Sequence, residues 1–187
     1  EETIQLFETF FSSRFSWKTR VVLLSQLRQT VFSNSFVFDA WKQRIAAIVT
    51  AQMEDERIEV REASAMALSH FFNSGFLPVS AEMIETLKRG YEKATAEGSM
   101  TRRHAAILGL CAIVSAFPYS VPPFMPDVMS FICAHGRERE PIKETIKRTL
   151  AEFKRTHQDC WHVHKESFTE DQLCVLMDFL VSPNYYV

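Results

Sequence analysis

The densest cluster of side chains that could bind a metal or act as a nucleophile lies in the segment HQDCWHVH, which contains His157, Cys160, His162 and His164. A zinc site needs about four such ligands arranged tetrahedrally around one point. His157 and Cys160 share a face only if the segment is helical, whereas His162 and His164 share a face only if it is extended. The spacing therefore favours a helix end followed by a surface loop, and we expect neither a metal nor a cofactor.

The sequence also lacks the usual patterns of catalytic sites. It contains no nucleophile elbow and no glycine-rich phosphate loop. Cys160 and His157 could form a thiol–imidazole pair, but no third side chain nearby would orient the base. We therefore expect a binding protein that is not an enzyme.

Charge and cysteine content exclude several other classes of protein. The chain has 187 residues and a net charge of -2, from 21 lysines and arginines against 23 acids. A domain that binds nucleic acid directly usually shows a basic excess, so we expect no direct nucleic-acid partner. No apolar run approaches the ~18 residues of a membrane span, so we expect no membrane partner. The four cysteines form no CxxC pair, which predicts buried free thiols in a reducing compartment.

Basic residues occur in pairs, and most of them have acidic neighbours. They are Lys88 and Arg89, Arg102 and Arg103, Arg137 and Arg139, Lys147 and Arg148, and Lys154 and Arg155. This pattern is typical of a solvated face with ion pairs. A second interpretation stays open, namely an anion site for a ligand such as an inositol polyphosphate.

Four segments repeat along the chain, each opening with a base and carrying a leucine seven residues later. The segments are RVVLLSQLRQTVF, REASAMALSHFF, RHAAILGLCAIV and KETIKRTLAEFK, and their leucines are Leu27, Leu68, Leu110 and Leu150. The leucines are separated by 41, 42 and 40 residues. Helix-pair repeats of the HEAT and armadillo type have periods of about 40–47 residues.

Further amphipathic segments between these four predict partner helices, one over residues 38–54 and others after Ser80, after PPFMP and after Thr169. Thr169 and Gln172 form a capping box for the last of these helices. The predicted fold is therefore all-α, a HEAT- or armadillo-like α-solenoid over residues 1–181. It would have about four antiparallel helix pairs and a C-terminal capping helix. The stretch DERIEVREASAMAL resembles the second helix of a HEAT repeat, and this implies a contact between Asp55 and Arg61.

The chain ends in SPNYYV, two tyrosines and a valine after a proline that disfavours helix at the residue before it. Residues 182–187 could form a docking peptide, since a free terminal carboxylate next to large side chains is a known recognition mode. Two alternatives stay open. The tyrosines could fold back on the domain, or the sequence could end here artificially.

The end of the chain resembles the docking motif of proteasome activators. That motif consists of a hydrophobic residue, a penultimate tyrosine and any final residue. Here these are Tyr185, Tyr186 and Val187. The stretches RRHAAILGLCAIVSAFPYSVPPFMP, IKRTLAEFKRTHQDCW and FTEDQLCVLMDFLVSPNYY are similar to the subunit 4 family of proteasome activators, which are large single-chain HEAT-repeat proteins. We therefore expect the chain to be the C-terminal piece of a longer protein.

The resemblance implies a mechanism and a partner. The tail would enter a pocket between two subunits of the outer (alpha) ring of the proteasome core particle and promote gate opening without ATP. The Val187 carboxylate would pair with a pocket lysine, Tyr186 would press on the gate segment, and Tyr185 would fill the apolar side. The resemblance also implies a protein of the nucleus and cytoplasm, with roles in DNA repair and spermatogenesis.

The family is also described as having a bromodomain-like region that binds acetylated histones, which would map to residues 1–100. An acetyl-lysine pocket needs a polar donor beside aromatic side chains, and the best candidates are Asn73, Phe72, Phe76 and Tyr91. Asn73 also has the features of an ordinary helix C-cap. Two alternative functions stay open, a reader of acetylated histones and a generic HEAT scaffold.

Overall fold

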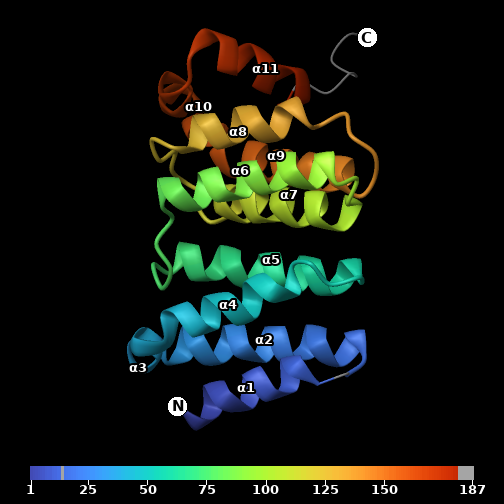
Figure 1. The fold of residues 1–187 in the computed structure, drawn as a ribbon. Helices are drawn as coiled ribbons and strands as arrows, with labels where there is room; N and C mark the ends of the chain where they lie inside the picture. Colours follow the sequence, from blue (N-terminus) through green and yellow to red (C-terminus); the bar gives the residue numbers. More distant parts are fainter. Residues whose placement is uncertain (14, 181–187) are drawn as a thin grey trace.

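The computed structural model describes residues 1–13 and 15–180 (Figure 1). The α-helices are α1 (Glu2–Ser12), α2 (Trp17–Ser33), α3 (Ser35–Phe38), α4 (Lys42–Gln52), α5 (Ile58–Asn73), α6 (Ala81–Ala96), α7 (Met100–Ser115), α8 (Met125–Ala134), α9 (Ile142–His157), α10 (Trp161–His164) and α11 (Glu170–Leu180). Short 3-10 turns lie between them: η1 (Asp39–Trp41), η2 (Gln158–Cys160) and η3 (Lys165–Ser167). The described residues contain no β-strand, which confirms the predicted all-α class.

The four repeated segments form one row of helices, α2, α5, α7 and α9, in which each helix packs against the next. The predicted repeat leucines Leu27, Leu68, Leu110 and Leu150 are all buried. A second row contains α1, α4, α6 and α8, and α4 and α6 pack on α5 and α7. Figure 1 shows the stack running from α1 at one end to α11 at the other. The chain is therefore a two-layered α-solenoid, as its period predicts.

α7 is the central helix of the solenoid. It contacts α5, α6, α8 and α9, and each residue from His104 to Val114 is buried. Small residues such as Ala105, Ala106 and Gly109 allow neighbouring helices to approach it closely. The core is thus continuous through the middle of the stack.

Several helix ends follow the predicted signals. The Ser80 hydroxyl accepts a hydrogen bond from the Met83 N–H (3.1 Å), which confirms the predicted N-cap of α6. The glycines Gly75 and Gly98 have φ values of 71° and 69°, a left-handed conformation that favours glycine after a helix. Within the described ranges, no helix has both the length and the apolar character needed to cross a membrane.

One local expectation held except at the start of the helix, and two others were wrong. The helix predicted over residues 38–54 is α4, preceded by the short α3 and η1. The predicted surface loop after α9 is instead a series of short helical turns, η2, α10 and η3. The prediction that the four cysteine thiols are buried is confirmed for Cys111 and Cys133. It is wrong for Cys160 and Cys174, which are exposed.

The contact expected between Asp55 and Arg61 exists only through the main chain. Arg61 Nη1 donates to the Asp55 carbonyl oxygen (2.7 Å). The Asp55 carboxylate pairs instead with Arg20 on α2 (2.8 Å) and accepts from the Arg57 N–H (2.9 Å). The aspartate therefore links neighbouring repeats, while the arginine satisfies carbonyls before its own helix.

Candidate functional site

The predicted docking residues Tyr185, Tyr186 and Val187 lie outside the described residues. The described part of this site is α11, which ends at Leu180 and leads into the tail. α11 packs on α8 and α9 at the end of the solenoid, which confirms the predicted capping helix. The structure therefore gives the support from which the tail continues.

The first turn of α11 is fixed by the predicted capping box. The Gln172 N–H donates to the Thr169 hydroxyl (3.3 Å), and the Gln172 side-chain oxygen accepts from the Thr169 N–H (3.0 Å). Phe168, which precedes Thr169, is buried, and its ring centroid lies 6.0 Å from that of Trp161. The Trp161 ring centroid in turn lies 6.4 Å from that of Phe153 on α9. A chain of aromatic side chains thus ties the start of α11 to the last repeat.

The other end of α11 is held by Phe179 and Leu176. Leu176 is buried, and Phe179 packs partly buried against the core. The Phe179 ring lies so close to Gly136 that a Cβ atom added there would be 2.4 Å from Cε1. In the sequence, Gly136 is only part of the break HGRERE. No local pattern relates it to an aromatic residue 43 positions later.

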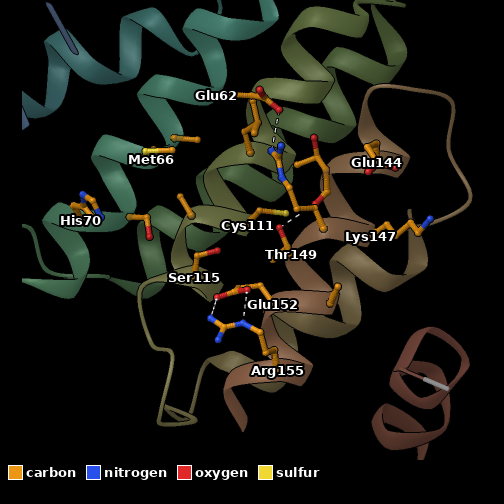
Figure 2. Close-up of a pocket in the computed structure, with 17 residues that line it drawn as sticks. Glu62, Met66, His70, Cys111, Ser115, Glu144, Lys147, Thr149, Glu152 and Arg155 are labelled. Atoms are coloured by element: carbon orange, nitrogen blue, oxygen red, sulfur yellow. Dashed lines mark hydrogen bonds and ion pairs between the residues drawn. The ribbon is translucent and has the colours of Figure 1, made fainter. Parts of the chain in front are cut away.

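A groove of about 750 Å³ runs between α5, α7 and α9 (Figure 2). Its apolar lining comes from all three helices and consists of Ala65, Met66, Leu108, Cys111, Ala112 and Ala151. Burial raises the pKa of the Cys111 thiol to about 11, so the thiol is protonated and inert at neutral pH. The groove can therefore accept an apolar group between the three helices.

The charges around the groove are largely paired. Arg148 on α9 reaches across α7 to Glu62 on α5 (2.8 Å), and Arg155 pairs with Glu152 on its own helix (Figure 2). These carboxylates neutralise two of the cations that an anionic ligand would use. Binding of an inositol polyphosphate therefore stays a prediction. Both arginines that line this groove, Arg148 and Arg155, are already paired with carboxylates.

The four acetyl-lysine candidates do not form one pocket. The Asn73 side-chain amide donates to the carbonyl oxygen of Ala116, just beyond the C-terminal end of α7 (2.7 Å). Tyr91 instead contacts Arg103, at the N-terminal end of α7, with its hydroxyl 3.2 Å from Arg103 Nη2. Phe72 and Phe76 are buried in the core. The Asn73 amide is thus already hydrogen-bonded. Asn73 and Tyr91 lie near opposite ends of α7, which is 16 residues long.

The His and Cys cluster does not converge either. His157 is buried, stacks on Phe153 with centroids 4.0 Å apart, and has Nδ1 3.0 Å from the Phe153 carbonyl oxygen. His164 lies beside it, at a centroid distance of 4.9 Å, whereas Cys160 and His162 are exposed. In residues 1–13 and 15–180, no three His, Cys, Asp or Glu side chains are grouped so as to hold a metal ion. His157 packs the end of α9.

A buried polar chain that the sequence analysis missed crosses three repeats. Arg61 Nε donates to His104 Nδ1 (3.1 Å), and His104 Nε2 lies 2.9 Å from the Thr145 hydroxyl. Burial, together with Arg61 and Arg148, lowers the pKa of His104 to about 4. In the sequence, the signal that could have indicated this polar chain is a histidine in the otherwise apolar stretch of RRHAAILGL.

The fold defines an α-helical repeat protein, in which two rows of stacked helices form a solenoid. Residues 100–187 match a family model described as "Proteasome activator complex subunit 4-like, C-terminal". The chain is 40% identical to Proteasome activator complex subunit 4A of Danio rerio and to Proteasome activator complex subunit 4 of Homo sapiens, in each case over 91% of this chain and 10% of the relative. It is 28% identical to Proteasome activator BLM10 of Saccharomyces cerevisiae, over 71% of this chain and 7% of that protein.

The chain belongs to the proteasome activator complex subunit 4 family and matches its C-terminal region. It spans about a tenth of the length of the curated relatives with which it shares 40% identity.

Proposed function

We propose that this chain is the docking end of a proteasome activator. Its tail would bind the outer ring of the core particle and promote gate opening without ATP. The observation that supports this most is the position of Tyr185, Tyr186 and Val187. In the sequence they come five to seven residues after Leu180, the last residue of α11, within a stretch that matches the C-terminal model of a family whose members are named proteasome activators.

The physical roles of the three residues follow from their chemistry. The Val187 carboxylate supplies a charge that fixes the register of an extended peptide, and a lysine in the receiving pocket would complement it. Tyr186 combines an apolar ring with a hydroxyl that can hydrogen-bond near the gate, and Tyr185 fills an apolar pocket. A ligand opens a gate only by binding the open state better than the closed one, so these contacts must be stronger in the open ring.

The solenoid would raise the effective concentration of the tail. Six residues bury little surface, so the tail depends on a second contact made by the rest of the protein. α11 provides a fixed point of departure within two residues of Ser182. Gate opening by this chain would therefore combine a specific peptide with a rigid support.

Deleting Tyr186 and Val187 is expected to weaken binding to the purified core particle at least about tenfold, while thermal unfolding stays unchanged. Binding of the full-length protein that ends in this chain to immobilised core particle would be measured by interferometry, and gate opening by fluorogenic peptide hydrolysis. Asn184→Ala is the matched control, since Asn184 acts only as a spacer. A free SPNYYV peptide should compete with the chain. Equal binding by the deleted and intact chains would instead favour a generic scaffold whose tail is incidental.

Tyr186→Phe removes one hydroxyl and should weaken binding by about 1 kcal/mol, the typical value of a single hydrogen bond. The same interferometry measures it. A loss larger than that of the deletion would contradict the proposed role of the hydroxyl.

A further inference from the structure

We propose that Gly136 is a positioning residue for the tail, because it admits the Phe179 ring and so sets the orientation of α11. This inference rests on the proposed function and concerns how the docking peptide is aimed. Gly136 lies in the turn between α8 and α9, and Phe179 lies one residue before the end of α11. The contact therefore joins the last repeat to the last turn of α11.

The space at Gly136 is closed on two sides. A Cβ atom there would be 2.4 Å from Phe179 Cε1 and 2.6 Å from Cζ, and 3.2 Å from the Cys133 carbonyl oxygen. Ordinary contact begins near 3.4 Å, so the ring would have to withdraw by about 1 Å. The carbonyl belongs to the main chain at the end of α8, and its oxygen already accepts the Gly136 N–H (3.0 Å). Gly136 itself therefore cannot shift away from the ring without losing that hydrogen bond.

Backbone conformation does not explain this glycine. The glycines with positive φ in the described residues are Gly75 and Gly98, and Gly136 is not among them. An alanine could adopt the same main-chain conformation, so the requirement for glycine comes from the Phe179 ring. Gly136 is also buried, which agrees with a site covered by a side chain.

The contact controls orientation because the two ends of α11 are held differently. Its start is fixed by the capping box and by Phe168, which packs on Trp161. Its end is held by Leu176 and Phe179 against the body of the solenoid. Displacing the ring would pivot α11 about its fixed start, so the largest movement falls where the tail begins. The end of α11, from which the docking peptide continues, would then take a different position relative to the solenoid.

Gly136→Ala is expected to weaken core-particle binding at least about fivefold and to raise amide hydrogen exchange in residues 174–180, with exchange in α5 and α7 unchanged. Gly90→Ala is the matched control, because nothing lies within 4 Å of a Cβ atom at Gly90, so both readouts should stay at wild-type values. Phe179→Leu gives a smaller, flexible side chain. The Gly136→Ala effect should therefore shrink in the Phe179→Leu background, as expected for residues in direct contact.

The two readouts separate this inference from the proposed function. Unchanged exchange in α11 of Gly136→Ala would overturn the claim that Gly136 sets the helix orientation. Increased exchange with wild-type binding would overturn its role in aiming the tail. If the unmodified full-length protein does not bind the core particle, the proposed function fails together with the aiming role, and the exchange data alone still decide whether Gly136 orients α11.

Discussion

Replacing Arg61 with methionine is expected to lower the free energy of unfolding by roughly 3 kcal/mol. Arg61 Nη1 donates to the carbonyl oxygens of Asp55 (2.7 Å) and Glu56 (3.0 Å), and Nε donates to His104. Methionine keeps most of the apolar stem but leaves these acceptors without their donor. Each buried polar group that loses its partner costs about 1–3 kcal/mol, partly offset because the buried charge is also removed.

Equilibrium denaturation by urea, followed by far-ultraviolet circular dichroism, measures this change. Arg155→Met is the matched control. Arg155 makes an exposed ion pair with Glu152 on its own helix, and such pairs contribute little to stability. A loss at Arg61 no larger than the loss at Arg155 would show that water replaces the missing donors, and that the polar chain does not stabilise the stack.

The row of helices could be predicted because a repeat places the same residue type in the core of every unit. Leu27, Leu68, Leu110 and Leu150 are buried because each faces the neighbouring repeats, and that periodicity is visible in one sequence. The capping box of Thr169 and Gln172 was equally predictable, since both partners lie within one helical turn. Signals of this kind are local or periodic.

The contacts between distant residues could not be predicted in the same way. Arg61 was recognised as part of a HEAT-like pattern, but its partner His104 lies 43 residues away on the next repeat. Which atoms meet there depends on the offset between adjacent helices, and the period does not specify this offset. The contact of Gly136 with Phe179 has the same origin, as does the separation of Tyr91 from Asn73. The docking tail was recognised by its resemblance to a family motif, and the prediction for Tyr185, Tyr186 and Val187 stays a prediction.

Acidification from pH 7 to pH 4 is expected to destabilise the fold by about 3 kcal/mol through His104 alone. The pKa of His104 falls from 6.5 to about 4 on folding, because the side chain is buried and faces Arg61 on α5 and Arg148 on α9. Between pH 6.5 and pH 4, His104 therefore binds a proton in the unfolded chain but stays neutral in the folded chain. Stability is unaffected above pH 6.5, falls as the pH drops from 6.5 to 4, and levels off below 4 as far as this residue is concerned.

The hydrogen bonds of His104 explain why its ring stays neutral in the folded state. His104 Nδ1 accepts from Arg61 Nε, so Nε2 carries the proton in the neutral ring and donates to the Thr145 hydroxyl. Protonation would place a second N–H against the Arg61 donor and add a positive charge beside a guanidinium. Neither change can be relieved by solvent, because the His104 side chain is fully buried.

His104→Gln separates this effect from other titrations. Glutamine keeps polar atoms at the site but cannot titrate, so we expect it to be less stable than the wild type at pH 7 and to lose less stability on acidification. The difference in unfolding free energy between the two proteins should shrink by about 3 kcal/mol between pH 7 and pH 4. His70 and His135, whose pKa values are also lowered by burial, are present in both proteins and cancel in this difference. A difference that stays constant with pH would mean that the folded chain accommodates a protonated His104, and that the Arg61–His104 hydrogen bond does not select the neutral ring.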